Sequence, residues 1–176
     1  MRFCVISTGG TIASSPGDEG LTPTMRGEQL LSHIPDLRRS GSVSVVDLLS
    51  KDSSNMHPDD WVRIARCVLE RRDEADGFLI LHGTDTMAYT ASALSYMLLG
   101  FDRPVVLTGS MHPIDVPGTD AIDNVRDSLL FVRELAKRGQ MGVSISFGGL
   151  LIHGPRSQKI LSHTQTAFSS INYPVV

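Results

Sequence analysis

Residues 3–12 read FCVISTGGTI, a short apolar run of high strand propensity that ends directly in a glycine turn flanked by hydroxyl side chains. Four more short apolar runs follow along the chain, each bounded by Gly, Pro, Ser or charged residues. We therefore expect five buried strands, at residues 3–6, 43–46, 78–81, 105–107 and 143–147.

Helical patterns separate these runs, at residues 28–34, 59–72, 86–99 and 120–138, and Pro58 suits the first turn of the second helix. Strands that alternate with helices predict right-handed crossovers and a mostly parallel sheet. The expected fold class is α/β: a three-layer domain in which a mostly parallel sheet is flanked by helices on both faces.

Composition limits the classes of function. With 176 residues, 41% of them hydrophobic, the chain can fill one core, so we expect residues 1–176 to form a single domain. The net charge is −3 and the basic residues are scattered, which argues against a nucleic-acid partner.

Cys4 and Cys67 lack metal-ligand spacing and are predicted to be buried thiols. No apolar run approaches the ~20 residues that cross a bilayer, and no cleavage region follows the first strand, so we expect no membrane partner and a cytoplasmic location.

Two turns rich in hydroxyl groups carry the candidate chemistry. The first is the glycine turn at residues 7–12, and the second is HGTDTM at residues 82–87, after the third strand. Each alone has a plainer explanation, since the first could be an ordinary glycine turn and Thr84 or Asp85 could cap the next helix. In a parallel sheet, however, both turns lie at the edge where ligands bind, and together they could supply a nucleophile and a proton relay.

A threonine hydroxyl is a weak nucleophile and needs a base or a cation beside it. Lys159, which ends the stretch GPRSQK at residues 154–159, is the candidate. An isolated lysine is more often an ordinary solvated side chain, so its candidacy depends on the two turns.

The two turns together resemble the two signature motifs of bacterial-type L-asparaginases. The motifs are TGGTI at residues 8–12 and HGTDTM at residues 82–87, in the family's order and spacing. The resemblance continues through DSSNM at residues 52–56, TGS at 108–110, TDA at 119–121 with Asn124, and the stretch that ends at Lys159. It covers essentially the whole chain.

This resemblance implies a role for each matching residue. Thr11 is expected to be the nucleophile that attacks the side-chain amide, forming a β-aspartyl enzyme and releasing ammonia. Thr84, Asp85 and Lys159 are expected to form a triad that relays protons and helps activate water. Ser53 matches the serine that holds the substrate's α-carboxylate, and Asp85 would also face its α-ammonium.

The rest of the expected site follows from the same resemblance and from the chemistry of the reaction. Ser54 stands where many family members place a glutamine that contacts the same end of the substrate, and Gly10 lets the backbone approach it closely. Backbone N–H groups of Thr11 or Thr84 could bind the oxyanion. No metal or organic cofactor is expected, and His82 is interpreted as structural.

Two features depart from the family pattern. Many members have a tyrosine beside the nucleophile, in the loop after the first motif, where this chain has Leu21. The base that activates Thr11 is therefore not identified by the resemblance. Members usually also have a smaller C-terminal domain, and we expect residues 1–176 to be an N-terminal-like catalytic domain without it.

Three functional hypotheses remain open. The first is an amidohydrolase that acts on a small molecule, L-asparagine, with L-glutamine as a weaker substrate, and that forms a homo-oligomer, either a dimer or a tetramer. The second is the amidase subunit of a tRNA-dependent amidotransferase, which passes ammonia to a partner. The third is an amino-acid-binding module with little or no catalytic activity.

Overall fold

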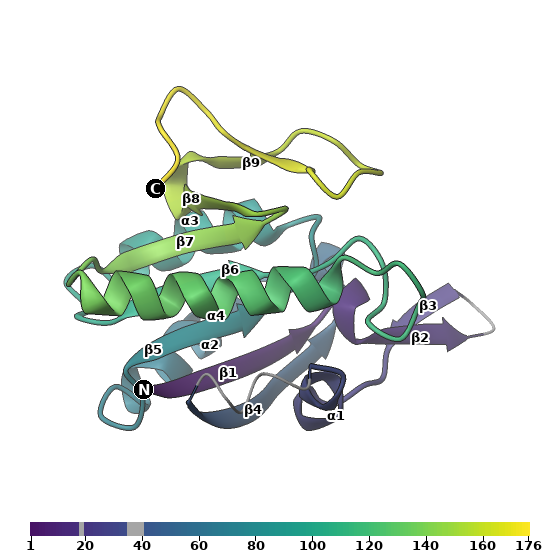
Figure 1. Cartoon of the computed structure of the whole chain (residues 1–176), viewed down its shortest axis with the longest axis horizontal. Coiled ribbons are helices and arrows are strands. Elements are labelled where there is room, and N and C mark those ends of the chain that lie inside the picture. Colours follow the sequence, from purple (N-terminus) through teal and green to yellow (C-terminus); the bar gives the residue numbers. More distant parts are fainter. Residues whose placement is uncertain (18–19, 35–40) are drawn as a thin grey trace.

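The computed structural model describes residues 1–17, 20–34 and 41–176, with the backbone alone at residues 15–17 and 20–23. A six-stranded sheet runs through the molecule in the order β4-β1-β5-β6-β7-β8, with helices on both faces (Figure 1). Its first five strands pair in parallel, and only β8 is antiparallel to its neighbour. The sheet and its helices are β1 (Arg2–Gly9), α1 (Gly27–Ser32), β4 (Ser42–Lys51), α2 (Pro58–Glu70), β5 (Gly77–Leu81), α3 (Met87–Met97), β6 (Pro104–Thr108), α4 (Ala121–Lys137), β7 (Gly142–Phe147) and β8 (Leu150–His153).

Two pairs of short strands form separate sheets beside the main one. The antiparallel pair β2 (Ser14–Gly17) and β3 (Gly20–Pro23) follows the first glycine turn, and the pair β9 (Ser157–Lys159) and β10 (Phe168–Ser170) follows β8. Short 3-10 turns are η1 (Thr11–Ala13), η3 (Ser53–Asn55) and η4 (Gly154–Arg156). None of the helices in the described part of the chain is long and apolar enough to span a bilayer.

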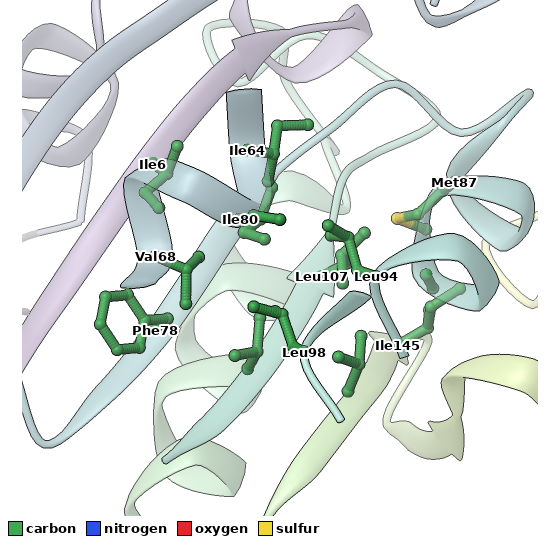
Figure 2. Packing of buried hydrophobic residues seen from close by; sticks show 14 of the residues in the cluster. Ile6, Ile64, Val68, Phe78, Ile80, Met87, Leu94, Leu98, Leu107 and Ile145 are labelled. Atoms are coloured by element: carbon green, nitrogen blue, oxygen red, sulfur yellow. The ribbon is translucent and has the colours of Figure 1, made fainter. Parts of the chain in front are cut away.

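Alternating side chains on the buried strands create a core on each face of the sheet. On one face, α2 and α3 cover residues such as Ile6, Ile80 and Leu107, and Figure 2 shows Ile64 and Val68 of α2 packed among them. On the other face, α1 and α4 cover the alternate strand positions. The α/β class and the flanked, mostly parallel sheet are confirmed.

One expectation about the strands is wrong. Strand β4 was expected to be buried, but its residues are partly or fully exposed along its whole length. The reason is its position, because β4 is the edge strand beside β1 and has a neighbour on one side only. The short strands β2, β3, β8, β9 and β10 are not among the strands expected from the sequence.

The strand order determines where a ligand site can form. From β1 the chain passes through α1 to β4 on one side, and it then returns through α2 to β5 on the other side. The order therefore reverses between β1 and β5. In open parallel sheets the crevice at such a reversal, beyond the carboxyl ends of the strands, is the usual ligand site.

Candidate functional site

The two hydroxyl-rich turns meet at this reversal. Strands β1 and β5 are in parallel register up to Ser7 and Leu81, so both turns leave the sheet side by side. A methyl group built on Gly10 would overlap the backbone of Gly83, and Gly10 has a φ of 80°. Only a glycine fits here, because the two turns are in backbone contact and the conformation is left-handed.

Three hydrogen bonds hold the turn that precedes and includes Thr11 in place. Thr8 Oγ1 donates to the carbonyl of Leu81 at 2.8 Å, and the Gly10 amide donates to the carbonyl of Lys51 at 2.9 Å. Ser14 Oγ donates to the carbonyl of Gly10 at 2.9 Å. Thr11 itself opens η1 and is partly exposed, so its side chain borders solvent at the end of a fixed backbone.

Ser53 lies against the second turn. It follows β4 in η3, is 3% exposed, and its Oγ would be 2.6 Å from a methyl group built on Gly83. Thr86 Oγ1 donates to the carbonyl of Ser53 at 2.7 Å. Ser54 is exposed, and its amide donates to Asp52 Oδ1 at 2.8 Å. The structure therefore brings Ser53 to the contact between the two turns and leaves Ser54 at its solvent side.

Thr84, Asp85 and Lys159 form a compact group. Lys159 Nζ donates to Thr84 Oγ1 at 2.8 Å and to Asp85 Oδ1 at 2.6 Å. Thr84 is 6% exposed and the side chain of Lys159 is 15% exposed, whereas that of Asp85 is 61% exposed. Lys159 is thus not an ordinary solvated lysine. Neither Thr84 nor Asp85 caps α3, since the N-cap residue is Thr86 and it makes no side-chain capping bond.

Lys159 reaches Thr84 because the chain reverses after β7. Gly148 and Gly149, with φ of 56° and 78°, turn the chain into the antiparallel strand β8. The following turn η4 packs on α3, where a methyl group on Gly154 would be 2.7 Å from Ser95 Oγ. Strand β9 then ends at Lys159, beside the N-terminal end of α3.

A cavity of about 620 Å³ opens beside this group, between α3 and the segment that carries β9 and β10. It is lined by Asp85, Ala88, Tyr89, Ser92, Pro155, Arg156, Ser157, Gln158, Lys159, Ile160, Ser162, Ile171 and Asn172. Asp85 and Lys159 both line this cavity, and Lys159 also contacts Thr84.

Asp120 and Asn124, for which the sequence suggested no role, support the neighbouring turn after β6. The Asp120 carboxylate accepts hydrogen bonds from the amides of Met111 and His112 at 2.9 and 3.1 Å. Asn124 Nδ2 donates to the carbonyl of Gly109 at 3.0 Å, and its Oδ1 accepts from the amide of Gly148 at 3.0 Å. The spacing of four residues between Asp120 and Asn124, at the start of a helix, was the available signal.

The described residues include no cluster of metal-binding side chains. Among residues 1–17, 20–34 and 41–176, no group of three or more His, Cys, Asp or Glu side chains is placed to hold a metal ion. Cys4 and Cys67 are free and buried, as predicted. The position of Leu21 is in β3, but its side chain lies outside the described part of the structure.

Comparison with known proteins adds the family. The model of the asparaginase N-terminal domain matches residues 2–176. The chain belongs to the asparaginase family. An L-asparaginase from Thermococcus kodakarensis is 43% identical over 175 residues, which cover 99% of this chain and 52% of that protein.

Members of the family with another role are also similar. A glutamyl-tRNA(Gln) amidotransferase component from Thermoplasma acidophilum is 36% identical over 98% of this chain and 43% of its own length. Among solved structures, the thermostable L-asparaginase from Thermococcus kodakarensis superimposes with a TM-score of 0.86 at 41% identity, covering 99% of this chain and 52% of that one. The asparaginase-type fold is thus shown, while the chain spans about half the length of these relatives or less.

Proposed function

We propose that this chain carries an amide-hydrolysing site that converts L-asparagine to L-aspartate and ammonia, with L-glutamine as a weaker substrate. The observation that carries the proposal is the double contact of Lys159 Nζ, 2.8 Å from Thr84 Oγ1 and 2.6 Å from Asp85 Oδ1. This group lies where the Thr84 turn touches the Thr11 turn through Gly83 and Gly10. A hydroxyl, an amine and a carboxylate in series are the parts of a proton relay.

The proposed reaction has two steps. Thr11 Oγ attacks the amide carbon, the carbon–nitrogen bond breaks, and the hydroxyl proton leaves with the nitrogen as ammonia. Water then attacks the resulting ester, loses its proton through Thr84 and Lys159, and restores the Thr11 hydroxyl while aspartate leaves. Backbone N–H groups of Thr11 or Thr84 stabilise the oxyanion in both steps. The steps need no metal and no cofactor.

Recognition of the substrate is assigned to the residues around this pair. Asparagine is a zwitterion, so its site needs a donor for the α-carboxylate and an acid for the α-ammonium. Ser53, buried against Gly83, suits the first role, and the exposed carboxylate of Asp85 suits the second. Gly10 and Ser54 border the same site. We further propose a single catalytic domain over residues 1–176 and a homo-oligomer, either a dimer or a tetramer, with no nucleic-acid partner.

Ammonia release from L-asparagine by the purified chain tests the proposal. Thr11→Val and Thr84→Val should each lower kcat by about 10³-fold or more, because each removes a reacting hydroxyl. Lys159→Met should do the same, whereas Lys137→Met, which removes an exposed lysine paired with Glu134 on α4, should leave kcat within about twofold. Unchanged activity in both threonine variants, or no ammonia from the unaltered chain, would overturn the assignment.

A second candidate function is supported by the similarity to the glutamyl-tRNA(Gln) amidotransferase component. In that case glutamine would be the preferred amide, and a partner would receive the ammonia. A kcat/KM for glutamine that exceeds the value for asparagine by about tenfold or more would favour this candidate, since a tenfold preference corresponds to about 1.4 kcal/mol of transition-state binding.

A binding module is the remaining alternative, and calorimetry separates it from an enzyme. Titration with L-aspartate or L-asparagine that shows tight binding, together with no ammonia release, would favour binding without turnover. Ser53→Ala serves as the control for the calorimetry, because loss of the proposed carboxylate donor should weaken binding about tenfold or more.

A further inference from the structure

His82 connects two helices to the Thr84 turn through a chain of hydrogen bonds. The residue is fully buried between β5 and α3. Its Nδ1 is 2.7 Å from the carbonyl oxygen of Gly83, and its Nε2 is 3.0 Å from Thr90 Oγ1 on α3. Trp61 Nε1, on α2, donates to the same Thr90 hydroxyl at 3.0 Å. Four groups are therefore joined in one line that ends at the peptide preceding Thr84.

The chemistry of the partners fixes the direction of every bond in this line. A carbonyl oxygen can only accept, so the Nδ1 of His82 must carry a hydrogen. Burial lowers the pKa of His82 to about 4, against the opposing effect of the bond to Gly83, so the ring is neutral at neutral pH. Its Nε2 is then an acceptor and receives the hydrogen of the Thr90 hydroxyl. The oxygen of Thr90 in turn accepts from Trp61, whose indole N–H can only donate.

We propose that His82, held as its neutral Nδ1–H tautomer by Thr90 and Trp61, is a positioning residue that sets the orientation of the Gly83–Thr84 peptide in the amide-hydrolysing site. The inference rests on the proposed function of that site.

The peptide plane carries the effect from His82 to Thr84. A trans peptide has its carbonyl and its N–H on opposite sides, so a bond that fixes the carbonyl of Gly83 also fixes the direction of the Thr84 amide. On its other sides the same peptide is confined by Gly10 and Ser53, because a methyl group on Gly83 would be 2.6 Å from Ser53 Oγ and the Gly10 backbone is in contact. His82 supplies the attractive contact that selects one orientation within this space.

Thr84 depends on that orientation in two ways. Its hydroxyl accepts from Lys159 Nζ at 2.8 Å, and its amide is a candidate oxyanion donor. A small rotation of the Gly83–Thr84 peptide would move both groups away from the reacting carbonyl. Misplacement of a reacting group by about 1 Å can cost about 100-fold in rate, so the line from Trp61 is expected to affect turnover although it touches no substrate.

Variants at Thr90 provide matched tests, since this residue lies on α3 outside the proposed site. Thr90→Val keeps the shape of the side chain but removes the donor to His82, whereas Thr90→Ser retains the hydroxyl. We expect Thr90→Val to lower kcat for L-asparagine about 10-fold to 100-fold with KM changed less than about threefold, and Thr90→Ser to remain within about threefold in both. Trp61→Phe, which removes only the N–H, should fall between the two.

Nuclear magnetic resonance separates positioning from a general loss of stability. At pH 7 the ring nitrogens of His82 should show a protonated Nδ1 and an unprotonated Nε2. The Thr84 amide resonance should shift in Thr90→Val and not in Thr90→Ser. Thermal unfolding curves should show that both variants are folded. An Nε2–H tautomer, or an unshifted Thr84 amide with unchanged kcat in folded Thr90→Val, overturns the inference. Failure of the unaltered chain to release ammonia overturns the proposed function, while the tautomer and the amide shift still decide whether His82 orients this peptide.

Discussion

Acidification is expected to destabilise the fold through His82 before it affects the carboxylates. The buried ring has a pKa of about 4, because burial disfavours its charged form, and an unfolded histidine titrates near 6.5. Above about pH 6.5 the ring is neutral in both the folded and the unfolded chain, so it does not lower the free energy of unfolding. As the pH falls from about 6.5 to about 4, the unfolded chain binds a proton that the folded chain does not, so unfolding becomes progressively easier.

The size of this effect follows from the two pKa values. Within the window each pH unit removes at most about 1.4 kcal/mol of stability, so lowering the pH from 7 to 4.5 should remove about 2.5 kcal/mol. Below about pH 4 both states are protonated and the loss from His82 levels off. Carboxylates whose pKa is lowered by ion pairs, such as that of Asp76 beside Arg2, lose their stabilising effect mainly below this window.

Urea unfolding at pH 7, 6, 5 and 4.5 measures the effect, with His82→Asn as the comparison. Asparagine does not titrate, and its amide can still donate to the carbonyl of Gly83 from about the position of the histidine Nδ1. The free energy of unfolding of the unaltered chain should therefore fall by about 2.5 kcal/mol more than that of the variant between pH 7 and 4.5. Parallel pH curves for the two proteins would show that His82 is not buried in its neutral form.

Three further predictions concern other parts of the fold. In urea unfolding, Gly10→Ala should lower the free energy of unfolding by at least about 2 kcal/mol more than Gly100→Ala does. Both glycines have a φ of 80°, but of the two only Gly10 would place the methyl group against a backbone, that of Gly83, so equal losses would contradict the close contact. Burial alone would raise the pKa of Asp60, but hydrogen bonds from Lys51 and from a backbone amide outweigh it and lower the pKa. Lys51→Met should therefore lower the free energy of unfolding by about 2 kcal/mol at pH 7, and a loss below about 0.5 kcal/mol would refute this. Burial raises the pKa of the thiols of Cys4 and Cys67. Mass spectrometry should therefore show that iodoacetamide at pH 8 labels the native protein about 100-fold more slowly than the unfolded protein, and rapid labelling of the native protein would count against the burial of these thiols.

Much of the sheet could be predicted because its strands have strong local signals. The apolar runs of β1, β5, β6 and β7 are buried between helices on both faces, and such strands read as nearly continuous hydrophobic sequence. Helix starts were also close to those observed, since Pro58 and the buried Asp60 mark the first turn of α2. Alternation of strands and helices then led to the correct edge of the sheet for the two hydroxyl-rich turns.

The position of Lys159 depends on features that local sequence does not specify. The chain must reverse at Gly148 and Gly149, pair β8 antiparallel to β7, and pack Gly154 against α3 before the lysine can reach Thr84. The glycine pair was a signal for a hairpin, but the strands beside it are short, and β9 has only three residues. Tertiary packing decides whether such short elements form. The sequence pattern therefore offered Lys159 only as a candidate cation, and its expected role in a triad came from the resemblance to the family.

Thr84 and Thr11 differ in the number of contacts that hold their side chains in place. Thr84 has a fixed hydroxyl partner in Lys159, and its backbone is held by the Gly83 carbonyl bond to His82. Within the described residues the Thr11 hydroxyl has no recorded hydrogen bond, although its backbone turn is fastened to β4 and β5. The part of the relay that activates water can therefore be argued from side-chain geometry in this chain. In the proposed reaction, the activation of Thr11 rests on the geometry of its turn alone, because the segment after the turn has Leu21 where many family members have a tyrosine. The proposal therefore needs a base other than that tyrosine for its first step.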